Sequence, residues 1–128
     1  MKNILITGGA GFIGLNFLKI ILKKNYNIIN VDNLSYAANK KIYKIKKKNY
    51  FFYKVNICDK KKMSDIFLKH NIDTVINFAA ESHVDNSIKK PNKFVNTNIV
   101  GTHNLLKCSY DYWFEKPFKV KKNFNKKC

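Results

Sequence analysis

Arginine is absent from this sequence, and acidic residues are few. All 25 basic side chains are lysines, against 8 Asp and Glu, so the formal net charge is +17. A charge of this size suggests nucleic acid or an anionic surface as a partner. Base readout, however, favours Arg, whose planar fork binds guanine and phosphate through paired hydrogen bonds. The missing Arg and the abundance of Asn, Ile, Phe and Tyr therefore indicate coding bias in an AT-rich genome. A nucleic-acid-binding module that uses Lys40 to Lys48 and the tail stays open as the less favoured alternative.

Cysteines are also few, and long apolar runs are absent. Cys58, Cys108 and Cys128 are odd in number, widely spaced and without a Cys-x-x-Cys pair, so neither a disulfide framework nor a zinc knuckle is indicated. His70 and His103 are assigned to helix surfaces, and no metal site is predicted. Lys or Asn interrupts every apolar segment before it reaches the roughly 18 residues of a membrane span. The sequence thus predicts a soluble, cytoplasmic protein with no membrane partner.

The residues that are present suffice for one folded domain. Across 128 residues the hydrophobic content is 45%, with 7 Tyr and 10 Phe, which excludes a disordered chain. Apolar, β-branched runs alternate with stretches of helical spacing. Strands are predicted at 3–7, 28–32, 50–57 and 74–78. Helices are predicted after Gly11, at 63–70 and from about 92 to 112, the last one preceded by a loop at 81–85 and a turn to Pro91.

This alternation predicts an α/β fold. Parallel strands need crossover connections, which are nearly always right-handed, so we expect a partial Rossmann fold with a parallel sheet of order 3-2-1-4 and helices on both faces. The predicted NAD-binding portion covers 1–114 and stops before a fifth strand. After Glu115 the apolar periodicity decays and Pro117 stops the helix, so 115–128 is predicted to be a basic tail, disordered or read out of frame.

A glycine-rich turn joins the first strand to the first helix. It reads Thr-Gly-Gly-Ala-Gly-Phe-Ile-Gly from Thr7 to Gly14. Glycines there allow a tight turn, let the backbone approach a pyrophosphate and permit close helix packing, while free N–H groups and the helix dipole face the anion. An acidic residue, Asp32, ends the next strand, as the dinucleotide-binding pattern requires. The turn with its flanking elements therefore predicts a dinucleotide site.

Asp32 bears on which dinucleotide binds. Its carboxylate can accept hydrogen bonds from the ribose hydroxyls and would repel a 2′-phosphate, which favours NAD over NADP. Lys40 and Lys41 lie close enough in sequence to soften that repulsion. The alternative is that Asp32 only caps a turn and the glycines only close a loop.

Further segments resemble the extended short-chain dehydrogenase/reductase family, and within it the dTDP-glucose 4,6-dehydratases. These segments are Asn56 to Asp59, Asn77 to Asp85 and Thr97 to Thr102, together with the glycine turn. The run Ala-Ala-Glu-Ser-His-Val-Asp from Ala79 to Asp85 is the most informative, because sugar 4-epimerases vary there. The resemblance spans residues 2 to about 113, the first third or so of a family enzyme.

The resemblance implies NAD as cofactor and assigns residues to it. They are Gly8, Gly11, Phe12, Ile13 and Gly14 at the pyrophosphate, Asp32, Asn33, Leu34 and Ser35 at the adenosine ribose, Asn56 and Ile57 at the adenine, Phe78, Ala79, Ala80, Glu81 and Ser82 below the ribose and nicotinamide, and Thr97 near the nicotinamide. Ser82 would also contact the sugar nucleotide, whereas His83 is interpreted as a hydrogen-bonding spacer. Taken alone, Phe78, Ala79 and Ala80 are more simply explained as a buried strand end, and Thr97 as a residue that packs or caps the long helix; together with the glycine turn they favour the cofactor site.

Two residues depart from the family pattern. Asn56 replaces the usual Asp, which keeps a carbonyl acceptor for the adenine amino group but loses the charge. Asn86 stands where an Arg is usual, which would weaken local ion pairing.

The resemblance implies an NAD-dependent lyase that acts on a dTDP-sugar as a homodimer. NAD takes a hydride from C4 of glucose, water leaves across C5 and C6, and the hydride returns to C6. The family's Tyr base with a Lys at i+4 and its Asp-Glu pair would follow a fifth strand, and this chain contains no Asp-Glu dipeptide. We therefore assign no catalytic residue and expect the chain alone to be inactive.

Four Tyr-x-x-x-Lys matches occur, at Tyr36/Lys40, Tyr43/Lys47, Tyr50/Lys54 and Tyr112/Lys116. With 7 Tyr and 25 Lys in the chain we interpret all four as coincidental. The alternatives to a dTDP-glucose 4,6-dehydratase are another extended dehydrogenase, such as a UDP-sugar epimerase or dehydratase, and a non-functional gene remnant.

Overall fold

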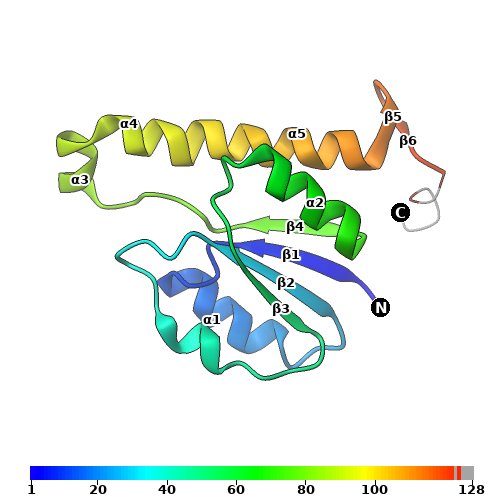
Figure 1. Cartoon of the computed structure of the whole chain (residues 1–128), viewed down its shortest axis with the longest axis horizontal. Helices are drawn as coiled ribbons and strands as arrows, with labels where there is room; N and C mark the ends of the chain where they lie inside the picture. The colour runs from blue at the N-terminus through cyan, green and yellow to red at the C-terminus, as the bar shows by residue number, and fades with distance from the viewer. Residues whose placement is uncertain (123, 125–128) are drawn as a thin grey trace.

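The computed structural model describes residues 1–122 and Phe124, without the side chains of residues 86 and 87. Four parallel strands form one sheet in the order β3-β2-β1-β4 (Figure 1). They are β1 (Asn3–Thr7), β2 (Asn27–Asp32), β3 (Tyr50–Lys54) and β4 (Thr74–Asn77). The predicted order 3-2-1-4 and the α/β fold are thereby confirmed. The expectation about Asn86 falls on a side chain outside this description.

Helices cover both faces of the sheet, as predicted. One face packs against α1 (Phe12–Ile21), and the other packs against α2 (Lys60–His70) and α5 (Thr102–Trp113) (Figure 1). Successive strand residues point to opposite faces. In β1, accordingly, Ile4 and Ile6 contribute to the core under α1, whereas Leu5 contributes to the core under α2 and α5.

Two strands differ from their predicted extent or burial. The third strand ends at Lys54, not Ile57, because the Asn56 side chain accepts a hydrogen bond from the Cys58 N–H and turns the backbone out of the sheet. The fourth strand, whose apolar run suggests burial, lies at the edge of the sheet, as the predicted order 3-2-1-4 implies, and its residues from Thr74 are half-buried or, at Asn77, exposed.

The segment after β4 is more helical than expected. A helix, α3 (Val84–Lys89), replaces most of the predicted loop and turn, and the i, i+4 spacing of Val84 and Ile88 was the available signal. The expected long helix then runs from Pro91 to Trp113 as α4 (Pro91–Phe94), a π-helical segment η2 (Val95–Gly101) and α5. Lys90, the residue before proline, has non-helical backbone angles (φ −138°, ψ 62°) and separates it from α3.

Residues after Trp113 form an element that the sequence did not predict. β5 (Phe114–Lys116) and β6 (Lys119–Val120) pair as a short antiparallel hairpin. The Phe114 ring stacks on Tyr110 with centroids 4.9 Å apart, which fixes the hairpin to α5. The segment 115–128, predicted as a basic tail, begins within this hairpin, and residues 123 and 125–128 lie outside the described chain. Within the described residues, none of the helices is long and apolar enough to cross a membrane.

Candidate functional site

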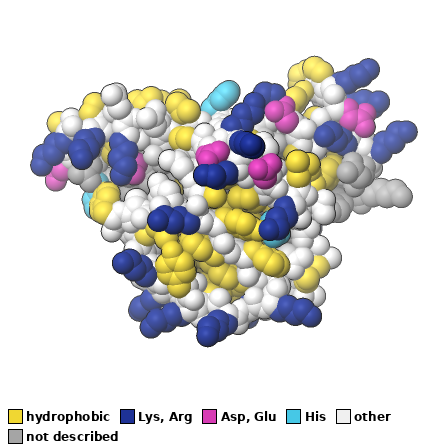
Figure 2. Space-filling view, viewed as in Figure 1, with side chains coloured by type: hydrophobic (Ala, Val, Ile, Leu, Met, Phe, Trp, Pro, Cys, Tyr) yellow, Lys and Arg dark blue, Asp and Glu magenta, His cyan; other side chains and the backbone are white. Residues whose placement is uncertain are grey.

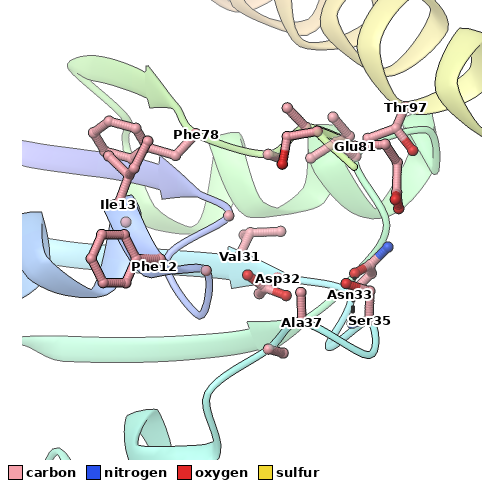
Figure 3. A pocket seen from close by; sticks show the side chains of 18 of the residues that line it. Phe12, Ile13, Val31, Asp32, Asn33, Ser35, Ala37, Phe78, Glu81 and Thr97 are labelled. Atoms are coloured by element: carbon pink, nitrogen blue, oxygen red, sulfur yellow. Dashed lines mark hydrogen bonds between the residues drawn. The ribbon is translucent and has the colours of Figure 1, made fainter. Parts of the chain in front are cut away.

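A cleft of about 400 Å³ opens where the carboxyl ends of β1, β2 and β4 meet (Figure 3). Open α/β sheets bind ligands at this edge, beside the strand where the connections reverse direction. The structure brings together there all of the predicted cofactor-binding residues except Leu34. They are Gly8, Gly11, Phe12, Ile13, Gly14, Asp32, Asn33, Ser35, Asn56, Ile57, Phe78, Ala79, Ala80, Glu81, Ser82 and Thr97.

The glycines of the turn have different roles. Gly8 has φ +70°, and a Cβ there would lie 2.4 Å from the backbone nitrogen of Ala79, so the turn and the end of β4 are in direct backbone contact. A Cβ on Gly14 would lie 2.2 Å from the Gly8 carbonyl oxygen, so α1 packs directly on the turn. Gly11 has more room for a side chain, because the nearest atom to an added Cβ is the Gly8 carbonyl oxygen at 3.3 Å. Gly8 and Gly14 therefore shape the turn, and Gly11 leaves open space at the cleft.

The N-terminus of α1 faces this open space. The first N–H groups of a helix have no intrahelical acceptor, and those of Phe12, Ile13 and Gly14 have no other backbone acceptor among the described residues. The Phe12 and Ile13 side chains are 84% and 67% exposed, so they do not close off the cleft. Three unpaired donors at the positive end of a ten-residue helix are an arrangement that suits an anion.

Asp32 holds the turn in place from the end of β2. Its Oδ2 accepts a hydrogen bond from the Ala10 N–H at 2.9 Å, and its Oδ1 accepts one from the Leu34 N–H at 2.8 Å. Asp32 therefore does cap a turn, as the simpler interpretation holds. An ionised carboxylate has about four acceptor sites, so the two oxygens can each accept another hydrogen bond from a ligand hydroxyl.

Leu34 contacts the site through its backbone alone. Its side chain packs against the apolar cluster of Ala10, Leu15 and Ile42, away from the cleft. Its φ of 56° belongs to the left-handed region, which is uncommon for a branched residue and is stabilised here by the hydrogen bond to Asp32.

The opposite wall of the cleft is the loop after β4, fixed to the long helix. The Glu81 N–H donates to Asn98 Oδ1 at 2.8 Å, and Asn98 Nδ2 donates back to the Glu81 carbonyl at 3.0 Å. The Glu81 carboxylate is buried and pairs with Lys93 at 2.8 Å. Asn98 and Thr97 belong to the π-helical segment η2, an element often found at functional sites.

Six residues that line the cleft are not among those that the sequence assigned to the cofactor. They are Val31, Tyr36, Ala37, Ala38, Val55 and His83. Tyr36 and His83 come from opposite walls, and their rings lie 5.6 Å apart. Lys93 Nζ lies 5.2 Å from the centroid of the Tyr36 ring. Tyr36, Ala37 and Ala38 directly follow Ser35, which was predicted to bind the cofactor, so their position in the sequence could have indicated that they line the cleft. No sequence signal indicated that Tyr36 and His83 meet, because they lie 47 positions apart in two loops that only the tertiary structure brings together.

None of the four Tyr-x-x-x-Lys pairs places both side chains at the cleft, whose lining includes no lysine. Lys47 donates to a backbone carbonyl after α1, Tyr50 accepts from Asn30 Nδ2 at 2.9 Å, and Tyr112 donates to Asn71 at 3.2 Å. Burial raises the pKa of the Tyr50 hydroxyl, so this phenol is a poor base.

The family follows from comparison with known proteins. The family model described as GDP-mannose 4,6 dehydratase matches residues 5–122. The chain belongs to this family. A relative in Haemophilus influenzae, a dTDP-glucose 4,6-dehydratase, is 47% identical over 116 residues, which cover 88% of this chain and 34% of the relative. The resemblance to dTDP-glucose 4,6-dehydratases is therefore confirmed, and the chain spans about a third of the length of the curated relatives it matches.

Solved structures similar to this chain include two enzyme types. A dTDP-glucose 4,6-dehydratase of Streptomyces venezuelae with NAD bound aligns with TM-score 0.79 and 35% identity over 86% of this chain and 36% of that one. A UDP-glucose 4-epimerase of Thermotoga maritima with UDP-glucose aligns with TM-score 0.76 and 38% identity over 86% of this chain and 34% of that one. The Rossmann fold is thus shared by dehydratases and epimerases alike.

Proposed function

We propose that this chain is the NAD-binding part of a dTDP-glucose 4,6-dehydratase. The observation that carries the proposal is the glycine turn, which directs unpaired helix N–H groups into the cleft beside the Asp32 carboxylate. The relatives at 40–47% identity are dTDP-glucose 4,6-dehydratases, which supports the dehydratase assignment.

The residues present fit NAD. A diphosphate fits the open space at Gly11, which a Cβ would narrow, and can accept hydrogen bonds from the unpaired amides of α1. The Asp32 carboxylate can accept hydrogen bonds from the ribose hydroxyls. Asn56 and Ile57 would flank the adenine, the loop from Phe78 to Ser82 would lie below the ribose and nicotinamide, and Thr97 would lie near the nicotinamide. Ser82 is our candidate contact to the sugar nucleotide.

Bound NAD would supply hydride transfer to and from the sugar. The residues of this chain bind and orient it: the α1 amides neutralise the diphosphate, and the buried Glu81 with its Asn98 and Lys93 contacts fixes the opposite wall. The cleft lining contains no lysine and no Asp directly followed by Glu. We therefore assign this chain cofactor binding and no catalytic residue.

Cofactor binding is tested with matched variants of α1. Ile13→Glu puts a carboxylate at the helix N-terminus, where it stabilises the helix but repels a diphosphate. Ile20→Glu is the control, because Ile20 has a similar exposure, 63% against 67%, but lies away from the cleft. In calorimetric titrations we expect Ile13→Glu to weaken NAD binding about tenfold or more, and Ile20→Glu to leave it unchanged. Absence of NAD binding in the unmodified chain would reject the proposal.

The dehydratase assignment has one close competitor, an epimerase, which the Thermotoga maritima structure favours. The two differ in product. Supplied with dTDP-glucose, a protein that includes this chain and the rest of the relatives' length should release a 4-keto-6-deoxy sugar nucleotide, which mass spectrometry detects as the loss of water. An epimer of unchanged mass would instead identify an epimerase.

The proposal includes a homodimer in the cytoplasm. On the long helix, Val95, Ile99 and Leu106 are 47%, 63% and 66% exposed, and a second copy could cover them. We expect Leu106→Glu to convert a dimer to a monomer in sedimentation experiments, while Leu68→Glu, an exposed leucine of α2, serves as the control.

A further inference from the structure

The end of β2 holds the glycine turn on both sides of Gly9. The Val31 carbonyl accepts the Gly8 N–H at 2.9 Å, and Asp32 Oδ2 accepts the Ala10 N–H at 2.9 Å. Gly9 itself is buried, does not line the cleft and does not have a positive φ. Neither a ligand contact nor the backbone conformation therefore explains why a glycine occupies this position.

The side chain that meets Gly9 is Asn30, the residue before Val31 on β2. A Cβ added at Gly9 would lie 2.1 Å from Asn30 Oδ1, 2.6 Å from its Cγ and 2.8 Å from its Nδ2. The amide group of Asn30 thus lies directly against the glycine, and the whole side chain is fully buried. Glycine is required at position 9 because a larger residue would collide with this amide in a closely packed interior.

The Asn30 amide is fixed from β3 but is only partly satisfied. Its Nδ2 donates to the Tyr50 hydroxyl at 2.9 Å, whereas its Oδ1 has no hydrogen-bond partner among the described residues. A buried acceptor without a partner lowers stability, and an apolar side chain here would avoid that loss. Ile28, two residues earlier on the same face of β2, belongs to the apolar core under α1. The stability of the fold alone therefore does not explain an amide at position 30.

We propose that Asn30 is a positioning residue of the dinucleotide site: its amide, held by Tyr50, fixes the place of Gly9 and thereby the direction of the first α1 amides. This rests on the proposed NAD binding, in which those amides contact the diphosphate. The connection is short, because the Gly11 N–H at the start of α1 donates to the Gly8 carbonyl at 3.1 Å, so a shift at Gly9 moves the helix N-terminus. Binding groups act well only when neighbouring side chains hold them to within about 0.5 Å.

Calorimetric titration with NAD of the unmodified chain, Gly9→Ala, Asn30→Ala and the double variant tests this role. We expect Gly9→Ala to weaken NAD binding about thirtyfold, because its methyl group displaces the turn, and Asn30→Ala to weaken it about fivefold. In the double variant the shortened side chain leaves room for the methyl group, so Gly9→Ala should add less than about twofold to the loss caused by Asn30→Ala. Equal effects of Gly9→Ala in the two backgrounds would overturn the proposal.

The urea midpoints of the same proteins test the contact even where Gly9→Ala is too unstable to titrate. We expect the double variant to regain most of the midpoint that Gly9→Ala loses, because the collision is gone. A double variant no more stable than Gly9→Ala would show that Asn30 is not what excludes a side chain at position 9, which also overturns the proposal.

Asn27→Ala is the control that separates positioning from stability. Asn27 begins β2 at the end far from the cleft, where its Nδ2 donates to Asn3 Oδ1 at 2.7 Å. This variant should lower the urea midpoint and leave NAD affinity unchanged. Unchanged NAD affinity in Asn30→Ala would overturn the positioning role while the proposed function stands, whereas absence of NAD binding in the unmodified chain would overturn both.

Discussion

Single atoms decide which glycines of the turn are replaceable. Gly8 and Gly14 have no room for a Cβ, and Gly8 also needs positive φ, whereas Gly11 has ordinary backbone angles of φ −72° and ψ 170°. The sequence pattern treats these glycines as equivalent members of one motif. The contact of Gly8 with Ala79, 71 positions later in the chain, is what distinguishes them.

We expect Gly8→Ala to lower the free energy of unfolding by about 3 kcal/mol, because the added Cβ meets rigid backbone and the φ is strained. Gly11→Ala should cost less than about 1 kcal/mol, because its Cβ needs a shift of only a few tenths of an ångström. Urea denaturation of the two variants measures the difference. Equal losses would show that the turn is not held against the end of β4.

His70 gives the fold a pH dependence. Burial, and secondarily the positive charge of Lys69, lower the pKa of His70 from its ordinary 6.5, and Tyr53 hydrogen-bonds to its Nε2 at 2.7 Å. The unfolded chain therefore binds the proton more tightly than the folded chain, so stability present above pH 6.5 is lost as the pH falls through the folded pKa.

We expect the urea midpoint to fall between about pH 7 and pH 5, and the fall to be smaller in His70→Gln. His103→Gln, at an exposed position of α5, is the matched control. An identical pH profile in His70→Gln would assign the loss to other groups.

At the scale of elements, the loop after β4 depends on the π-helical segment. Asn98 satisfies both backbone groups of Glu81, so a side chain of η2 sets the course of the cleft wall. The sequence predicted a regular helix here. The π-helical turn could not be predicted from it, because the segment's shape follows from contacts with the loop and from the close approach of Gly101 to Ile57.

Asn98→Ala should leave the Glu81 N–H and carbonyl unpaired and lower stability by about 1–3 kcal/mol. We also expect faster hydrogen exchange at the Glu81 amide. Asn92→Ala, at an exposed position of α4, is the control and should change neither. Unchanged exchange at Glu81 in Asn98→Ala would contradict the role given to this side chain.

For the whole molecule, the dominant property is its charge. Figure 2 shows lysine side chains scattered over the visible face, at its edge and in its middle, with exposed hydrophobic side chains between them and acidic groups in the minority. On this face they do not form a single stripe that would follow a nucleic-acid backbone. This distribution agrees with the interpretation that the lysines reflect composition and not a nucleic-acid interface, which stays a prediction.

Two salt effects are expected from a net charge of +17. Raising ionic strength from about 0.02 M to about 0.5 M should increase the urea midpoint, because screening weakens the repulsion between lysines. Oligonucleotide binding should fall steeply over the same range and show no sequence preference. Selective oligonucleotide binding that survives about 0.5 M salt would instead support a nucleic-acid function.

The sequence alone determined the strand order, both helical layers and most of the cleft lining, because these depend on local periodicity and on a turn whose glycines lie within one short segment. Tertiary structure decided the rest. It joined Tyr36 to His83 across the cleft and placed Lys54 beside Asp32 by strand register. Each of these is a contact between distant segments, and such contacts depend on how the chain packs, which no local pattern encodes.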